Sequence, residues 1–201
     1  MELLGRAIAA VNTAPYGGRV SKRLGRQEWI NAGLKALAEH GAEAVRIERL
    51  ADTLRVTKGS FYWHFKDRGA LLEALLEAWQ ARATNAIIDQ VEARGGDART
   101  RLETLFTIVA QVDGRLDRAV RGWAAQDDMA RSALEEVDRQ RLGYLDMLFR
   151  GIGFTPAEAI ARARLIYHAL IGQFMMGAAV AHGDRLAECL DIILPMLVRK
   201  A

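Results

Sequence analysis

Residues 47–65, IERLADTLRVTKGSFYWHF, constrain the fold most, because they predict two short helices around a tight turn. The apolar residues of the first half recur at i, i+3, i+4 and i+7, which places them on one face of a helix. They are Ile47, Leu50, Ala51 and Leu54. Arg55 and Val56 break this pattern, and Thr57 suits the N-cap of a new helix because its side-chain oxygen can accept an orphan backbone N–H. A second helix is therefore expected over Lys58–His64.

This second helix carries two kinds of side chain. Phe61 and Phe65 are four positions apart, so they share a face and can anchor the helix to a core. The other residues are polar, basic or aromatic with a polar tip, which suits phosphate oxygens and base edges. They are Thr57, Lys58, Ser60, Tyr62, Trp63 and His64. The alternative is a buried aromatic helix of an ordinary bundle, but core helices seldom carry Lys-Gly-Ser before Tyr-Trp-His. The segment therefore predicts a DNA-binding helix-turn-helix.

The segment resembles the DNA-binding motif of the TetR family (TetR/AcrR-type) of transcriptional regulators. That motif runs from an apolar helix through a Gly-Val-Ser/Thr turn to a Tyr-x-x-Phe recognition helix, a Lys, a charged residue and a Leu-Leu pair. The matching positions are Ala51, Val56, Thr57, Gly59, Tyr62, Phe65, Lys66, Asp67, Leu71 and Leu72. Arg55 stands where the family usually has Gly, and a left-handed conformation there would cost about 1–2 kcal/mol. Gly69 also departs, since a helix-favouring residue is more usual at its position.

The resemblance implies a ligand-responsive repressor that binds a palindromic operator in double-stranded DNA as a homodimer. It also implies an unidentified small-molecule effector and no other cofactor. Lys66 and Tyr62 are the expected phosphate contacts, whereas Trp63 and His64 are ambiguous between base reading and packing against the DNA backbone. The full set of expected DNA-binding residues is Arg46, Thr57, Lys58, Gly59, Ser60, Tyr62, Trp63, His64 and Lys66.

Composition predicts an all-α fold. The 201 residues include only three prolines, and no run alternates apolar and polar residues as a half-buried strand would. Three regions are expected: a lead over 1–20, a three-helix DNA-binding unit over 21–68, and a larger ligand-binding and dimerisation bundle over 69–201 that the fourth helix joins to the first unit. The nine expected helices lie at about Arg26–His40, Ile47–Leu54, Lys58–His64, Lys66–Arg94, Asp97–Val112, Leu116–Gln126, Asp127–Gly151, Pro156–Ala181 and Arg185–Arg199.

Positive charge is concentrated in the half that holds the turn motif. Residues 1–68 contain 12 Lys and Arg against 7 Asp and Glu, and residues 69–201 contain 16 against 18. A basic first half is what a chain that neutralises phosphates needs. Four basic residues near its start form either a solvated arm or one that contacts DNA, and they are Arg19, Lys22, Arg23 and Arg26.

The chain is expected to be cytoplasmic. Its single cysteine, Cys189, excludes an intramolecular disulfide and fits a reducing compartment. The apolar run near the start is too short for an export signal. Residues 165–181 are nearly all apolar, but Tyr167, His168 and Gln173 favour a buried bundle helix over a membrane span.

The larger bundle is expected to hold both an effector pocket and a dimer interface. Aromatic and soft side chains on its helices are the expected pocket lining, namely Phe106, Trp123, Tyr144, Met147, Tyr167, His168, Phe174 and Met175. The helix over 156–181 is apolar nearly all round, so it is expected to pair with its copy in a four-helix interface together with the last helix. The expected interface residues are Gly172, Met176, Gly177, Leu190, Ile193, Leu194 and Leu197.

Two other functional classes, an enzyme and a protein without specific DNA binding, have less support in the sequence. No metalloprotease, P-loop, nucleophile-elbow or dinucleotide motif occurs, and the four histidines form no helical i, i+4 metal pair, so no catalytic or metal-binding residue is predicted. The second alternative is a helical protein-interaction module, or a small-molecule-binding bundle, without specific DNA binding. It would leave the Lys58–His64 surface without a purpose.

Overall fold

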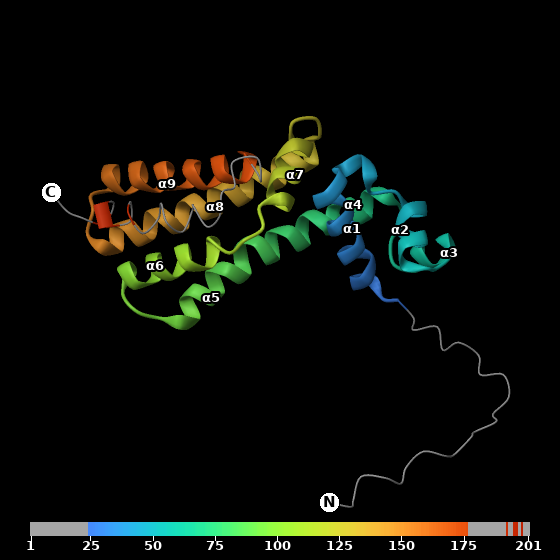
Figure 1. The fold of residues 1–201 in the computed structure, drawn as a ribbon, viewed down its shortest axis with the longest axis horizontal. Helices are drawn as coiled ribbons and strands as arrows, with labels where there is room; N and C mark the ends of the chain where they lie inside the picture. The colour runs from blue at the N-terminus through green and yellow to red at the C-terminus, as the bar shows by residue number, and fades with distance from the viewer. Residues whose placement is uncertain (1–23, 177–191, 193–194, 197, 199–201) are drawn as a thin grey trace, which may run out of the picture.

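The computed structural model describes residues 24–176, 192, 195, 196 and 198, and within them every regular element is a helix (Figure 1). The all-α prediction is therefore confirmed. Eight of the nine expected helices fall among these residues, counting the long fourth helix once. The lead over 1–20, Cys189 and most of the expected last helix lie outside the described residues.

The first three helices form a compact head at one end of the molecule. Helices α1 (Arg26–His40) and α2 (Ile47–Leu54) begin and end as predicted, and the short helix η1 (Ala42–Ala44) joins them. The predicted end of the third helix is wrong, because α3 spans only Lys58–Phe61. The Phe61 carbonyl accepts from the backbone N–H groups of both His64 and Phe65, at 2.9 and 3.1 Å. This turn closes the helix early and returns Phe65 to the core.

The turn between α2 and α3 contains a left-handed arginine. Arg55 has φ 57° and ψ 44°, and it is the only described non-glycine residue with positive φ. Its N–H donates to the Asp52 carbonyl at 3.1 Å, and the Val56 N–H reaches back to the Ala51 carbonyl at 3.0 Å. This pair of bonds is a Schellman ending, which usually has glycine at the left-handed position. The chain therefore keeps the turn of the family at the expense of backbone strain.

A long rod leads from the head into the larger bundle (Figure 1). It consists of α4 (Arg68–Gln80), the π-helical segment η2 (Ala81–Asn85) and α5 (Ala86–Arg94), and it ends at Gly95 with φ 69°. The prediction of one regular helix from Lys66 was therefore wrong in two details. Asp67 caps α4 by accepting from the Ala70 N–H at 2.9 Å, so the helix starts at Arg68. The π turn is the second difference, and π turns often mark functional sites.

Four further helices of the bundle lie within the described residues, namely α6 (Ala98–Val109), α7 (Arg115–Ala124), α8 (Asp128–Ile152) and α9 (Pro156–Met176). Asp97 and Asp127 cap α6 and α8 by accepting backbone N–H bonds. A capping box precedes α9, because the Thr155 N–H donates to the Glu158 carboxylate at 2.9 Å and the Glu158 N–H donates to the Thr155 hydroxyl at 3.4 Å. None of the helices in the described part of the chain is long and apolar enough to cross a membrane.

Two hydrophobic cores lie end to end along the molecule. The first joins α1 to α4 with α7 and the first half of α8, and the second joins α5 and α6 to the second half of α8 and α9. The head therefore has two connections to the bundle: the rod, and the packing of α1 against α7. Gly33 permits close approach of α1 to α4, since a Cβ there would lie 2.8 Å from Leu75 Cδ2.

The strain at Arg55 generates a stability prediction. We expect Arg55→Gly to raise the free energy of unfolding by about 1 kcal/mol, because glycine accepts the left-handed conformation but loses more entropy on folding. Urea unfolding at a fixed protein concentration measures the change. The matched control is Arg49→Gly in the interior of the same helix, which should lower the free energy of unfolding by about 1 kcal/mol. A loss of stability at both positions would contradict the strain.

Candidate DNA interface and ligand cavity

The end of the head presents an aromatic surface to solvent. Phe61 and Phe65 are buried, as expected from their spacing, and Phe61 packs edge-on against Trp29 with ring centroids 5.2 Å apart. Tyr62 and Trp63, between them, are 60% and 86% exposed. Exposing a tryptophan this fully stabilises nothing within the described fold. The side chain is instead available to another molecule.

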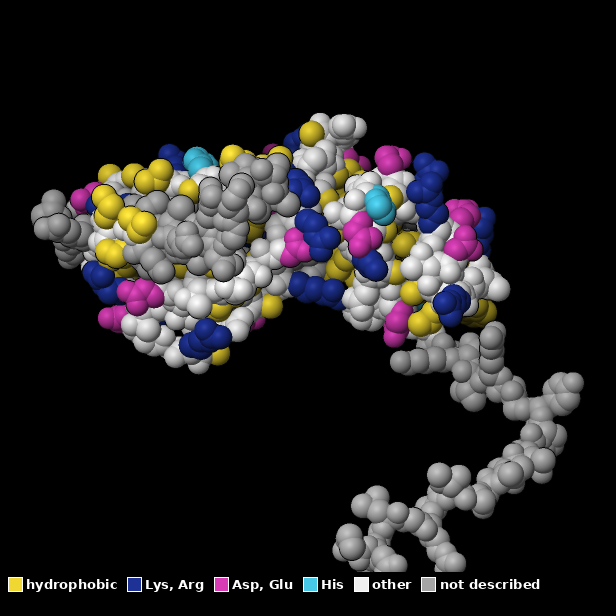
Figure 2. All heavy atoms as spheres, viewed as in Figure 1, with side chains coloured by type: hydrophobic (Ala, Val, Ile, Leu, Met, Phe, Trp, Pro, Cys, Tyr) yellow, Lys and Arg dark blue, Asp and Glu magenta, His cyan; other side chains and the backbone are white. Residues whose placement is uncertain are grey.

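Basic side chains surround this surface, and they differ in whether they already have an ion-pair or hydrogen-bond partner within the protein. The Lys58 ammonium lies 2.6 Å from the Glu48 carboxylate of α2, and this contact raises the pKa of Lys58. Arg46 donates from Nε to the Glu43 carbonyl at 3.1 Å. Lys66 is exposed and has no ion-pair partner among the described residues. Figure 2 shows Lys and Arg side chains on several sides of the head.

The remaining polar residues of the turn have different surroundings. Thr57 is the N-cap of α3, but the predicted side-chain cap is wrong, because its hydroxyl accepts no backbone bond and stays exposed. Ser60 is half-buried. His64 is also half-buried, and its Nε2 lies 2.9 Å from the Leu24 carbonyl oxygen, which holds the ring against the start of α1.

Gly59 has no structural reason to be glycine within the described fold. A Cβ built there would meet only Thr57 Oγ1, at 3.7 Å, which is an ordinary contact. Its φ is not positive. Glycine also lowers helix propensity by about 1 kcal/mol relative to alanine. Close approach of something outside the protein is the remaining physical reason for a residue without a side chain.

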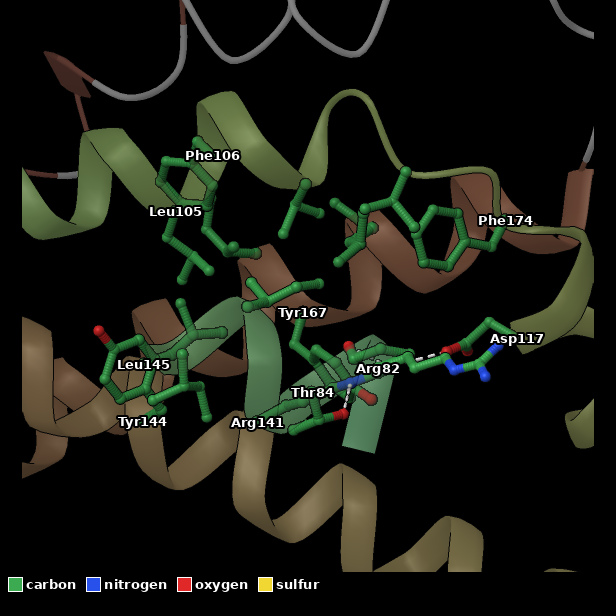
Figure 3. A pocket seen from close by; sticks show the side chains of 18 of the residues that line it. Arg82, Thr84, Leu105, Phe106, Asp117, Arg141, Tyr144, Leu145, Tyr167 and Phe174 are labelled. Atoms are coloured by element: carbon green, nitrogen blue, oxygen red, sulfur yellow. Dashed lines mark hydrogen bonds and ion pairs between the residues drawn. The ribbon is translucent and has the colours of Figure 1, made fainter. Parts of the chain in front are cut away.

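A cavity of about 500 Å³ lies where the two hydrophobic cores adjoin. Its wall comes from the rod, α6, the loop after α6, α7, α8 and α9, and it is mostly apolar. Figure 3 shows Leu105, Phe106 and Leu145 on one side and the linked groups of Thr84, Asp117 and Arg141 on another. This volume, and a mostly apolar lining with a few polar groups, are typical of small-molecule sites.

Four of the eight expected pocket residues line this cavity, namely Phe106, Tyr144, Tyr167 and Phe174. The other four do not. Trp123 packs against the core of the head instead. Met147, His168 and Met175 are exposed, because they lie on the faces of α8 and α9 that turn away from the cavity. Helical spacing alone did not separate these faces, since both are apolar in sequence.

A largely buried network of charged residues adjoins the cavity, since Asp117, Arg141 and Tyr167 belong both to the network and to the cavity wall. The Asp117 carboxylate, 4% exposed, accepts from Arg121 Nε at 3.0 Å and from Arg141 Nη1 at 2.7 Å. Arg121 also donates two bonds to Asp138, at 3.1 and 2.6 Å. The Tyr167 hydroxyl donates to Asp138 at 2.6 Å and accepts from Arg121 at 2.9 Å. These bonds join α7, α8 and α9.

Arg141 extends the network to the rod. Its Nε donates to the Thr84 hydroxyl at 3.0 Å, and its Nη2 donates to the Ala83 carbonyl at 3.2 Å. Both acceptors belong to the π-helical segment, and a side chain that enters the backbone ladder is a common cause of such a turn. From the same segment, Arg82 donates to Asn31 of α1 at 2.7 Å. The π turn therefore contacts both the cavity and the head.

Sequence reasoning missed this network entirely. Charged side chains are usually solvated, so composition and spacing give no reason to expect them in a core. A usable signal existed, because Asp117 and Arg121 are four positions apart on a helix that also places Val120 and Ala124 in the core. Buried partners on other helices cannot be identified from such spacing.

The expected dimer-interface residues are only partly described. Gly172 is half-buried with open space beside it, and Met176 is 56% exposed. Gly177, Leu190, Ile193, Leu194 and Leu197 lie outside the described residues. Large apolar side chains are exposed elsewhere among the described residues of the bundle, and these are Met147, Leu165, Met175, Ile192 and Met196. Figure 2 shows hydrophobic side chains along α9 at the end of the bundle away from the head.

No group of three or more His, Cys, Asp or Glu side chains that could hold a metal ion occurs in the part of the chain that is described.

Comparisons with known proteins identify a single class of relatives. The model of the bacterial regulatory proteins of the tetR family matches residues 30–75. The tetracycline repressor protein class G of Vibrio anguillarum is 37% identical over 166 residues, which are 81% of this chain and 73% of that protein. Among solved structures, reduced NemR of E. coli has a TM-score of 0.73 at 17% identity, covering 88% of this chain and 98% of that one.

A regulator from Saccharomonospora viridis, solved in complex with choline, also has a TM-score of 0.73 at 17% identity and covers 85% of this chain and 95% of that one. At such identities the structural matches establish the fold, whereas the repressor from Vibrio anguillarum establishes kinship in sequence.

The buried network generates a second stability prediction. We expect Asp117→Asn to lower the free energy of unfolding by about 3–5 kcal/mol, because Arg121 and Arg141 would lose a charged partner while remaining buried. Chemical unfolding followed by circular dichroism measures the loss. The matched control is Asp128→Asn, which removes the exposed ion pair with Arg131 and should cost at most about 1 kcal/mol. Equal effects of the two substitutions would contradict the importance of burial.

Proposed function

Because this chain belongs to the TetR family and is therefore a DNA-binding transcriptional regulator, we propose that it is a homodimeric repressor. In this proposal it binds a palindromic operator and releases it when a small molecule occupies the cavity. DNA binding by the head is supported most by one short segment, which buries Phe61 and Phe65 and exposes Tyr62 and Trp63. A regulator of this kind works beside the chromosome, so we place it in the cytoplasm.

The surroundings of each side chain suggest its role on DNA. Lys66 has no ion-pair partner within the described residues, so it can neutralise a phosphate without breaking an ion pair inside the protein. Lys58 has to leave Glu48 to do the same, which makes its contribution smaller. We assign contacts with phosphates or base edges to Thr57 and Ser60 of the N-cap and helix α3, and to Tyr62 directly after it. We extend the same proposal to Arg46 and Trp63.

His64 has a different proposed role. Its ring is fixed against the Leu24 carbonyl, so it has little freedom to reach a base edge. We therefore propose that His64 orders the start of α1, which the basic residues Arg19, Lys22 and Arg23 precede in the sequence.

Dimerisation would cover the exposed apolar side chains of the bundle. Leu165, Met175, Ile192 and Met196 are between 49% and 70% exposed, and several large apolar groups exposed together mark an interaction surface. A two-fold dimer through α9 and the last helix would bury them. Two heads separated by about 34–36 Å could then enter successive major grooves of a palindrome.

The rod provides a physical route from the cavity to the head. Its π turn is held by Arg141 on the cavity side and by the Arg82–Asn31 bond on the head side. A ligand that displaces the cavity wall would therefore shift α1 through short hydrogen-bonded contacts. A change in the separation of two heads removes the advantage of binding both half-sites together, so affinity for the operator would fall steeply. The choline complex of the relative from Saccharomonospora viridis supports a small-molecule effector as a class.

The proposed role of Lys66 is tested by the salt dependence of DNA binding. We expect Lys66→Ala to weaken binding to every duplex alike and to reduce the slope of log affinity against log salt by about one. Fluorescence anisotropy with fragments of the chain's own upstream region, across a salt series, measures both quantities. Arg150→Ala, at the far end of α8, is the control and should leave the slope unchanged. Absence of binding by the unaltered chain at low salt would exclude the proposal and favour a bundle without specific DNA binding.

Gly59 provides a test in which stability and function should move in opposite directions. We expect Gly59→Ala to leave the free energy of unfolding unchanged or to raise it by up to about 1 kcal/mol. Operator affinity should nevertheless fall roughly tenfold, because the new methyl group would occupy the space of the DNA backbone. Gly122→Ala is the matched control, since its Cβ would also meet open space but on α7. Operator affinity that does not change in Gly59→Ala would show that DNA does not approach this position closely.

A further inference from the structure

The charged groups in the cavity wall cancel one another. Of the described residues that line it, two are arginines, Arg82 and Arg141, and two are aspartates, Asp113 and Asp117. The remaining lining residues carry no formal charge. The two tyrosines keep their protons at neutral pH, since burial raises the pKa of Tyr167 to about 12 and raises that of Tyr144 as well.

Each of these charged groups also has a partner inside the protein. Asp117 accepts from two arginines, and Arg141 donates to Asp117, Thr84 and the Ala83 carbonyl. Asp113 accepts from Arg115 Nε at 2.7 Å. Arg82 donates to Asn31 outside the cavity. Three of the four charged groups are therefore in ion pairs within the protein, and the fourth, the Arg82 guanidinium, is hydrogen-bonded to the Asn31 side chain.

A charged ligand would be unfavourable in such a site. A charged ligand would move its ion from water to a mostly apolar wall. To obtain a counter-charge it would have to break an ion pair of Asp113, Asp117 or Arg141, or the Arg82–Asn31 hydrogen bond. An uncharged ligand loses little hydration and gains contact with the apolar side chains from α6, α8 and α9.

We propose that the effector is an uncharged, predominantly apolar molecule of drug-like size, and that the paired charges of the wall exclude anions and cations of the same shape. This inference rests on the proposed function in that it concerns the same cavity. It concerns binding alone, so it can be tested without DNA.

Matched fluorescent probes test the proposal on the full chain. N-phenyl-1-naphthylamine is uncharged, and 8-anilinonaphthalene-1-sulfonate is the same skeleton with a sulfonate. Diphenylhexatriene and its trimethylammonium derivative form the corresponding pair for a cation. We expect each neutral probe to bind at least tenfold more tightly than its charged counterpart, measured by fluorescence titration.

A blocked cavity shows whether the probe binds there. Val109 lines the cavity on α6, whereas Thr107 on the same helix is exposed and does not. We expect Val109→Trp to abolish binding of N-phenyl-1-naphthylamine and Thr107→Trp to leave it unchanged. Circular dichroism and gel filtration establish that both variants are folded.

A second variant tests the charge balance without filling the cavity. Asp113 is exposed at the cavity wall, so Asp113→Asn should fold and leave the wall with an excess positive charge. We expect the affinity for 8-anilinonaphthalene-1-sulfonate to rise several-fold while that for the neutral probe stays constant. Asp128→Asn removes an aspartate from another exposed ion pair, away from the cavity, and should change neither affinity.

Two results would overturn the proposal: a charged probe that binds the unaltered chain as tightly as its neutral partner, or neutral-probe binding that survives Val109→Trp. Operator release is measured separately by anisotropy with the neutral probe present. Tight neutral-probe binding without operator release would count against ligand-controlled release and would leave the ligand class supported.

Discussion

The pairing of Asp117 with Arg121 and Arg141 is the interaction on which the arrangement of the bundle depends. Three helices and the π turn of the rod meet at these side chains, and each helix contributes a group that would be costly to bury alone. The network keeps α7, α8 and α9 in a fixed relation, and this relation leaves the cavity open beside them. A core of apolar side chains could have held the same helices together without these charged pairs.

The head depends on this arrangement through α7. Because α1 packs against α7 as well as against α4, the DNA-binding surface is fixed to the bundle at two places. A single connection would let the head pivot freely about the rod. Two connections mean that the head moves only when α7 and the rod move relative to one another, and the buried network lies between these two elements.

The sequence predicted the head better than the bundle, for physical reasons. The turn motif depends on local rules, so apolar spacing located α1 and α2 correctly, and the resemblance to the family motif pointed to the left-handed position at Arg55. The early end of α3 was missed because Phe65 returns to the core through a turn that propensity does not indicate. In the bundle, helical spacing found the elements but could not say which apolar face lines a cavity. Arg121 and Asp138 are 17 positions apart on different helices, so their pairing depends on tertiary packing and cannot be predicted from local sequence patterns.

The π turn has a consequence for the phase of the whole rod. Buried positions step by four from Leu75 to Trp79, then by five to Thr84, and then reach Val91 at ordinary helical spacing. One additional residue in a helical turn rotates everything beyond it by about 100°. Without it, the side of α5 that now faces the second core would point elsewhere. One continuous rod can therefore serve two cores whose directions do not coincide, and the length of the Ala81–Asn85 segment, more than its composition, keeps head and bundle in register.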